Sequence, residues 1–469
     1  MSIISTIKGW FKMIFGEKAR QEFDIESIIS PEMVSLITKC ENIYAGKPFW
    51  LDDEDNIKTV NFAKAICSET ARLATLAIGI KVDGSGRAKW LQEQIDNVYG
   101  NLRTWTEYGC AYGTIILKPS GKGVDFVKPN DFIITDQEGD KIMGAAFITR
   151  EVDGTGKKFY TRIEYHRFDE DNIYCISNRC YVGKKADDLE KRVDIEATPW
   201  AGLQDDVQIA DLDSPLFAVF KTPHANNIDT DSPMGLPVFS DAIEELKDLD
   251  IAYSRNAKEV KDSKRTVLLD SDRMVPVGTP LQNQGAYFDK QRKEMGLPDI
   301  IKNVYGDGQQ SFYQEINPVL NTETRLVQIN ALLNQIGYKC GFSNGYFVFN
   351  EKNGIQTATQ VESEDQRTIQ FIKDVRDKLE QCLEDLIQAL DAFSDLYDLS
   401  PTGSYKVSYD FGDITYNYEE DKARWYAYVT AGKVPFWYYL VKFEGFSEED
   451  AKELEQSAQR QEPEGYEEE

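Results

Sequence analysis

The chain has 469 residues, enough to bury large cores and to form several structural units. It carries 80 acidic and 53 basic residues, and its formal net charge is −27. This acidity argues against a protein that grips DNA phosphates with a broad basic surface, because such binding needs clustered Lys and Arg. It is typical of a highly soluble protein, and also of a surface past which DNA can slide.

The seven cysteines are scattered and odd in number, which favours a reduced intracellular setting over a disulfide scaffold. Cys175 and Cys180 are near enough in sequence that they could be close in space. The chain has only two histidines, His166 and His224, which argues against a zinc site built on them. No apolar run approaches the length of a membrane span.

The first twenty residues place Ile4, Ile7 and Phe11 on one side of a predicted helix, with lysines between them. They lack the long apolar stretch and the cleavage site of a signal peptide. We expect an amphipathic helix that docks on the protein itself or on a neighbouring subunit. The acidic remainder of the chain disfavours the alternative, which is binding to a membrane surface.

Residues 24–100 are predicted to be mostly helical with short connections. Apolar spacing indicates a helix over Asn61–Leu76 and a strand over Ile78–Val82. A further helix is predicted from Leu91 to Tyr108, ending near Gly109.

From Gly113 to Gly183 the apolar period changes from helical to alternating, which predicts short antiparallel strands and hairpins. The stretch from Phe217 to Leu236 belongs to the same β-rich region. Gly154–Lys158 has part of the composition of a phosphate loop. It lacks the earlier glycine and the final Ser or Thr and joins two strands, so we interpret it as a hairpin turn.

Two helices then flank a segment of different composition. Ser240 is a suitable N-cap for a helix over Asp241–Lys264. Residues 265–320 lose the helical period and carry Gly, Pro and strand-like runs, which predicts a small inserted α/β or β module. The second helix is predicted over Thr322–Cys340.

A loop with four turn-forming residues, Asn344, Gly345, Asn353 and Gly354, leads into a helix of unusual length over 359–400. One face of this helix is apolar over several turns. Its apolar residues recur every three or four positions: Ile372, Val375, Leu379, Leu383, Leu386, Leu390 and Phe393.

The C-terminal part is predicted to contain one strand and three short helices, with Gly432 ending the first helix and Ser447 capping the third. These elements are Tyr405–Phe411, Glu419–Thr430, Pro435 to Phe443, and the helix after Ser447. The acidic tail, Gln461–Glu469, has almost nothing apolar to bury and is expected to be disordered.

Known catalytic motifs are absent, because the chain has no GxSxG, HExxH or CxxC. A nuclease would need clustered carboxylates around a metal, and no cluster stands out from the 80 acids. The sequence therefore predicts no catalytic residue, no metal ligand and no cofactor.

The string that opens the long helix is distinctive: an aromatic stretch, then Asn350 to Ile355 (Asn-Glu-Lys-Asn-Gly-Ile), then Thr-Ala-Thr at 357–359. In this string, and in the order of its segments over nearly the full length, the chain resembles portal proteins of tailed phages. The closest similarity is to portal proteins of siphophages that infect Gram-positive bacteria. The resemblance implies an α+β portal fold with a mixed α/β wing, a helical stem, a small inserted clip, a long wing helix and an α-helical crown. The implied boundaries are wing 1–239, stem helix 240–264, clip 265–320, second stem helix 321–341, tunnel loop 342–358, long wing helix 359–400, and crown with acidic tail 401–469.

Portal proteins of this kind form a ring, usually of twelve subunits, at one capsid vertex, and double-stranded DNA is packaged and ejected through it. The resemblance therefore implies a non-enzymatic protein of the virion that passes through the host cytoplasm during assembly. The implied partners are further copies of the chain, DNA in transit, terminase, head-completion or connector proteins, and the major capsid and scaffolding proteins. No membrane partner is implied.

The resemblance places the tunnel loop in the DNA channel, where six residues are expected to meet DNA: Glu351, Lys352, Asn353, Gly354, Gln356 and Thr357. An ordinary turn that touches only its own subunit is the other interpretation of this loop. For the whole protein, the alternatives are a metal-dependent nuclease or other DNA-processing enzyme of a mobile element, and another structural virion protein such as a tail or adaptor subunit.

Overall fold

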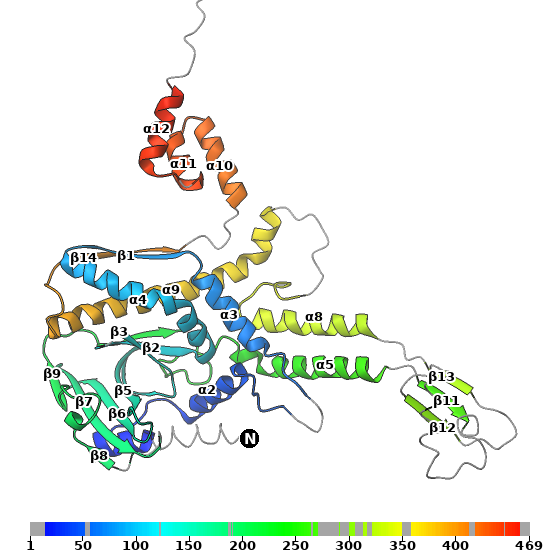
Figure 1. The fold of residues 1–469 in the computed structure, drawn as a ribbon, viewed down its shortest axis with the longest axis horizontal. Helices are drawn as coiled ribbons and strands as arrows, with labels where there is room; N and C mark the ends of the chain where they lie inside the picture. The colour runs from blue at the N-terminus through cyan, green and yellow to red at the C-terminus, as the bar shows by residue number, and fades with distance from the viewer. Residues whose placement is uncertain are drawn as a thin grey trace, which may run out of the picture. The chain divides into compact units, whose positions relative to one another are not determined.

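The structure is a computed structural model with a mixed α+β fold (Figure 1). It describes residues 15–51, 57–121, 123–185, 189, 191–263, 266–270, 290, 300–304, 313–316, 321–348, 358–411, 418–444 and 446–459. The chain divides into two compact units, and each is described by itself. The first comprises Met1–Thr75 and Gly79–Tyr409, and the second comprises Leu76–Ile78 and Asp410–Glu469.

Part of the N-terminal amphipathic segment packs on the protein itself. Residues 15–23 are helical, and Phe15 and Ala19 are fully buried against a sheet. Their neighbours in that cluster include Ile163 and Tyr181. The prediction of docking on the same chain is confirmed for these residues, while residues 1–14 lie outside the described part.

Three helices and one strand follow, near the predicted places: α2 Pro31–Tyr44, α3 Phe62–Ala74, β1 Ile78–Gly84 and α4 Gly86–Tyr112. The predicted end of α4 at Gly109 is wrong. The helix continues to Tyr112 and ends at Gly113, which has φ of +81°. Gly109 is instead needed for close packing, because a Cβ at this position would lie 2.4 Å from the ring of Phe220.

The β-rich region forms two antiparallel sheets. The first has the order β10-β2-β3, with β2 Thr114–Ser120, β3 Gly123–Val127 and β10 Ala218–Lys221. The second has the order β4-β5-β6-β7-β8, with β9 also paired to β7. Its strands are β4 Phe132–Glu138, β5 Lys141–Val152, β6 Phe159–Phe168, β7 Tyr174–Gly183, β8 Lys191–Val193 and β9 Asp206–Ile209. Met33 and Ile37 of α2 pack into a core with residues of both sheets.

Two predictions about this region have different outcomes. The hairpin turn is confirmed, because Gly154–Lys158 joins β5 to β6 and the Asp153 carboxylate accepts the backbone N–H groups of Lys157 and Lys158. The proximity of Cys175 and Cys180 is wrong. Both lie on β7, where five residues of extended chain span about 16 Å. All seven cysteines are buried free thiols.

Helices α5 Ile243–Asp262 and α8 Thr322–Lys339 lie side by side (Figure 1). Ser240 does not cap α5 as predicted. It begins a short 3-10 turn, η2 Ser240–Ala242, and the cap position of α5 is occupied by Ala242. The second predicted helix is confirmed, because α8 ends with Cys340 as its C-cap.

The described residues between α5 and α8 form a three-stranded sheet of order β12-β11-β13. Its strands are β11 Thr266–Asp270, β12 Ile300–Val304 and β13 Tyr313–Ile316. β11 pairs parallel to β12 and antiparallel to β13. A β module inserted between two helices is therefore confirmed for these residues.

The long helix α9, Ala358–Leu396, spans 39 residues and packs across β2 and β10 and against α3 and α4. The predicted apolar stripe is buried from Ile372 to Leu390. Arg376 of α9 is also buried, and its guanidinium donates to the carbonyls of Leu73 and Ala74 at the end of α3. Leu73 and Ala74 belong to the last turn of α3, where carbonyls lack N–H partners from a following turn, so Arg376 caps that helix end with a positive charge.

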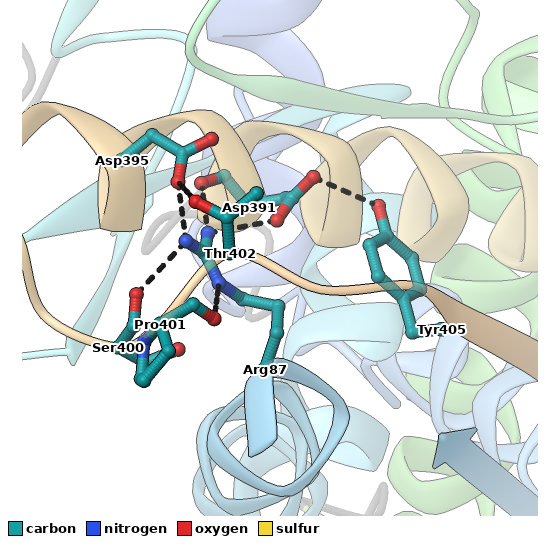
Figure 2. Close-up of polar contacts among 7 residues, drawn as sticks. All are labelled: Arg87, Asp391, Asp395, Ser400, Pro401, Thr402 and Tyr405. Carbon is teal, nitrogen blue, oxygen red and sulfur yellow. Dashed lines mark hydrogen bonds and ion pairs between the residues drawn. The ribbon is translucent and has the colours of Figure 1, made fainter. Parts of the chain in front are cut away.

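The guanidinium of Arg87, on α4, is fully buried at the C-terminal end of α9 (Figure 2). It donates to the carbonyl and carboxylate of Asp391, at 2.7 and 2.8 Å, and to the Asp395 carboxylate. It also donates to the carbonyls of Ser400 and Pro401. Five acceptors therefore surround the five N–H donors of one side chain. This arrangement connects α4 to the segment that enters β14.

Strand β14, Tyr405–Phe411, has the predicted bounds and pairs with β1. The second unit contains α10 Tyr418–Thr430, α11 Phe436–Glu444 and α12 Glu448–Gln459. Aromatic side chains pack between these helices, as in the stacked pair Trp425–Tyr438. Ser447 caps α12 as predicted, because its Oγ accepts the Asp450 N–H at 3.2 Å. The tail Gln461–Glu469 lies outside the described residues.

The two glycines of α4 allow a matched test of close packing. Gly109→Ala should lower the melting temperature, because the new methyl group overlaps the buried Phe220 ring and overpacking costs about 1–3 kcal/mol. Gly100→Ala should raise it, since nothing lies within 4 Å of the new Cβ and removing a helical glycine gains about 0.5–1 kcal/mol. Thermal melts of both variants check the opposite signs. A Gly109→Ala protein as stable as the parent would contradict this account.

Candidate functional site

The candidate functional site is the loop that joins α8 to α9. The six residues expected to meet DNA, Glu351, Lys352, Asn353, Gly354, Gln356 and Thr357, lie outside the described residues, so their placement stays a prediction. The structure describes the two ends of the loop. We call these ends the loop base and define it as residues 338–348 together with 367–371 of α9.

The chain leaves α8 through a glycine that the sequence analysis did not single out. Gly341 has φ of +91°, and its N–H donates to the carbonyl of Tyr338 at 3.2 Å. The N–H of Phe342 donates to the carbonyl of Gly337 at 2.9 Å. These two bonds are the Schellman motif, which satisfies the last carbonyls of a helix. The sequence does carry a signal for this turn, because a glycine shortly after the last residue of the apolar helical repeat is typical of a helix end.

Aromatic side chains fill the loop base. The fully buried ring of Phe342 lies 4.8 Å from Phe347 and 5.8 Å from Phe371 of α9. Phe347 also contacts Phe62 of α3 at 5.1 Å. Gly341 is needed here for space as well as for its φ, because a Cβ would lie 2.6 Å from the Phe371 ring.

A pair of hydroxyl residues joins the two ends of the loop. The Ser343 N–H donates to Thr368 Oγ1 at 2.8 Å, and the Thr368 N–H donates to Ser343 Oγ at 3.2 Å. Both side chains are buried, and their hydroxyl oxygens lie 3.1 Å apart. Because water has little access to this pair, the loss of one hydroxyl would leave an N–H group unsatisfied.

Charged and polar contacts fix the outer part of the loop base. Tyr346 donates its hydroxyl proton to the Glu69 carboxylate. The hydrogen bond from Arg72, followed by that from Tyr346, holds the pKa of Glu69 below its ordinary value. Burial and the bond to Glu69 raise the pKa of Tyr346. Glu69 therefore stays ionised and Tyr346 stays protonated near neutral pH.

Arg367 and Gly345 make two further contacts in the loop base. The guanidinium of Arg367 lies 4.0 Å from the ring centroid of Tyr338 and donates to its carbonyl at 3.0 Å. Gly345 has φ of +82°, which confirms one of the predicted turn residues, and its N–H donates to Asn334 Oδ1 at 2.6 Å. Asn344 is not among the described residues with positive φ.

The helix pair α5–α8, which precedes the loop, is joined by ion pairs along its length. Lys339 Nζ lies 2.7 Å from the carboxylate of Glu245, and Arg325 pairs with Glu259. Apolar side chains on the same two helices are exposed, including Tyr253, Val260, Leu326, Val327 and Tyr338. Val327 is 69% exposed, so this pair presents an apolar surface that is open in the part of the chain that the structure describes.

No group of three or more His, Cys, Asp or Glu residues suited to a metal ion occurs in the part of the chain that the structure describes. Within the same part, none of the helices is long and apolar enough to cross a membrane.

A family model described as "Phage portal protein, SPP1 Gp6-like" matches residues 32–464. The comparison with curated proteins finds no match. Among solved structures, the chain is similar to one titled "Virion of native gene transfer agent (GTA) particle". That similarity has 12% sequence identity and a TM-score of 0.43, and it covers 89% of this chain and 95% of that chain.

The Ser343–Thr368 contact yields a direct test of the loop base. Thr368→Val keeps the shape of the side chain but removes the acceptor of the Ser343 N–H, so about 1–3 kcal/mol of local stability should be lost. Hydrogen exchange measured by mass spectrometry should become faster over residues 342–348. Gln370→Ala, which alters an exposed side chain on the same helix, serves as the control and should leave exchange unchanged. Equal exchange in both variants would show that the hydroxyl pair does not hold the loop base.

Proposed function

The chain belongs to the SPP1 Gp6-like family of phage portal proteins, and we propose that it forms the ring through which double-stranded DNA enters and leaves the capsid. The family match covers most of the chain and is the observation that carries this proposal. Portal proteins are structural proteins of a capsid-associated oligomeric assembly. The finer parts of the proposal are a ring of twelve subunits and a phage of the siphophage type that infects Gram-positive bacteria.

We assign the segments of the portal as follows. The wing is 1–239 with the long wing helix 359–400, the stem is 240–264 with 321–341, the clip is 265–320, and the crown with its acidic tail is 401–469. The antiparallel pair α5–α8 and the small sheet between these helices support the stem and clip assignments. The three-helix unit near the C-terminus supports the crown. In this proposal the clip binds terminase during packaging and the head-completion or connector proteins afterwards, and the ring also contacts the major capsid and scaffolding proteins.

The exposed apolar side chains of α5 and α8 support assembly. Tyr253 and Val260 lie seven residues apart on α5, which places them near one face of the helix, and Val327 and Tyr338 are exposed on α8. Monomeric proteins rarely leave such surfaces uncovered. If one face of each copy contacts a different face of the next copy, the copies form a closed ring when a whole number of them completes one full turn.

We place the loop 342–358 in the bore of the ring, where its apex meets passing DNA. Two observations support this role. The loop base is fixed by buried aromatic packing, the Ser343–Thr368 pair and the Schellman turn, so movement at the apex would not disturb the flanking helices. The net charge of −27 also favours weak contact, because an acidic surface repels phosphate and does not release counterions to bind it.

Electron microscopy of the purified protein tests the proposed function. We expect rings with a central hole, and native mass spectrometry should give a single closed stoichiometry. Val327→Glu should weaken the rings without unfolding the subunit, since the Val327 side chain is 69% exposed. A strictly monomeric protein at micromolar concentration in several salt conditions would count against a portal. Metal-dependent cleavage of DNA by that monomer would favour the alternative, a nuclease.

The loop apex can be tested in assembled particles. Lys352→Glu should leave ring assembly intact but change the efficiency of DNA packaging or retention, because one weak phosphate contact per subunit is replaced by repulsion. Gly354→Val should reduce packaging more than stability if the apex needs a glycine. Lys64→Glu, at an exposed position on α3, is the matched charge control and should package normally. A cryo-EM map of the assembled ring in which the loop lies away from the bore would overturn this assignment, whatever the variants do.

A further inference from the structure

One of the two histidines of the chain contacts the loop base. The ring of His224 stacks on that of Phe371 of α9, with ring centroids 5.4 Å apart and an interplanar angle of 24°. Phe371 is buried, whereas His224 is partly exposed. The imidazole therefore lies between the aromatic packing of the loop base and the solvent, at a place where a histidine can exchange protons with water.

The ring of Phe371 connects this histidine to the point where the loop begins. A Cβ added to Gly341 would lie 2.6 Å from that ring, so the backbone of the Schellman turn rests directly against it. The fully buried ring of Phe342, the next residue of the loop, lies 5.8 Å from Phe371. Because such packing leaves little free space, a displacement of Phe371 would disturb both the turn and the aromatic cluster.

The backbone that carries His224 is fixed on both sides of this residue. Two residues earlier, the N–H of the buried Thr222 donates to the Gly113 carbonyl at 3.0 Å. Two residues later, the side-chain amide of Asn226 donates to the Met234 carbonyl at 3.1 Å. His224 therefore meets the loop base from a set position, so a change in the charge of its ring acts directly on the ring that it contacts.

Among the described residues, three charged groups act on His224: Asp241 from η2, and Arg367 and Asp374 from α9. Arg367 lies four residues before Phe371 and Asp374 three residues after it, so both lie on the face of α9 that carries this ring. Burial lowers the pKa of His224 below its ordinary value, and Arg367 lowers it further. The two carboxylates raise this pKa but do not outweigh burial.

A lowered pKa links the protonation of His224 to the opening of its surroundings. In the closed loop base the imidazole is partly desolvated, whereas in an opened base it is hydrated and its pKa returns toward the ordinary value. The open form therefore binds the proton more tightly than the closed form. The stability that neutral His224 contributes is present above the ordinary histidine pKa and is lost as the pH falls below it. Acidification thus favours the open form.

We propose that His224 is a proton-sensitive support of the loop base, which holds Phe371 in place as a neutral ring and releases it as a cation, so that residues 338–348 loosen in acid. The inference deepens the proposed function, and its consequence for DNA rests on that function, because a loosened base gives the loop 342–358 more freedom in the bore. The response of the base itself does not depend on DNA or on a ring, and it can be measured on the purified chain.

Two other ionisable groups of the loop base keep their charge state in mild acid. The pKa of Glu69 is held below its ordinary value by its hydrogen bond from Arg72, and burial raises the pKa of Tyr346. The other histidine, His166, lies on β6 in the second antiparallel sheet, and burial lowers its pKa as well. A test of His224 must therefore separate its response from that of His166.

Hydrogen exchange of the full-length protein, measured by mass spectrometry at about pH 7.5 and about pH 5.5, tests the response, because histidine titrates between these values. After correction for the intrinsic pH dependence of amide exchange, peptides that cover residues 338–348 should exchange about threefold faster at the lower pH. Equal corrected rates at the two pH values in the parent protein would overturn the proposal.

Variants separate the two histidines. His224→Phe keeps a ring against Phe371 but cannot be protonated, so residues 338–348 should exchange at equal corrected rates at both pH values. His224→Gln also cannot become charged, and it replaces the first variant if that protein does not fold. Peptides of β6 report His166 and should respond to pH in the same way in the parent and in the variant. A pH response of residues 338–348 that persists in the folded variant would assign it to another group and overturn the proposal.

The titration of His224 can also be measured directly. Exchange of the imidazole C2 hydrogen, followed by mass spectrometry, reports the pKa of each histidine, and the chain has only two. The pKa of His224 should lie below the ordinary histidine value. Arg367→Gln should raise it and Asp374→Asn should lower it, because the first change removes a like charge and the second an opposite charge. A pKa at or above the ordinary value, or one that neither substitution moves, would overturn the proposal.

Discussion

The buried guanidinium of Arg87 is the interaction on which the arrangement of the first unit depends. It joins α4 to residues more than 300 positions later in the chain, at the end of α9 and before β14 (Figure 2). A buried positive charge is tolerated only when its donors are satisfied and its charge is compensated. Asp391 and Asp395 supply the compensation, and three backbone carbonyls complete the hydrogen bonds. These contacts therefore fix the end of α9 relative to α4.

A second buried arginine acts near the middle of α9. Arg376 caps the carbonyls that end α3, and α3 in turn supplies Glu69 and Phe62 to the loop base. The loop between α8 and α9 thus begins and ends on a part of the protein that is held by packing and by charge. A fixed base of this kind is what the proposed role of the loop requires.

The buried charges of the first unit are compensated by the chain itself. Near α9, the donors of Arg87 all have acceptors among the described residues. On β6, the Glu164 carboxylate pairs with Lys118 and Arg162 and lies 2.9 Å from His166 Nε2. Both clusters are buried, and a buried charge is tolerated where opposite charges and hydrogen bonds compensate it.

Elements that depend on neighbouring residues were predictable from the sequence. Local patterns predicted the apolar repeat of α9, the strand β14, the hairpin turn at Gly154–Lys158 and the Ser447 cap, and each was confirmed. Features that depend on distant residues could not be predicted from the sequence. Gly109 looks like a helix end but is a packing position against Phe220, and Ser240 looks like a cap but begins a 3-10 turn. Nothing in the sequence near Arg87 indicates a buried charge, because its five acceptors lie on a segment more than 300 residues away. Periodicity and capping determine which elements form, whereas the desolvation of charges and the space beside a glycine are decided only when the folded chain brings distant residues together.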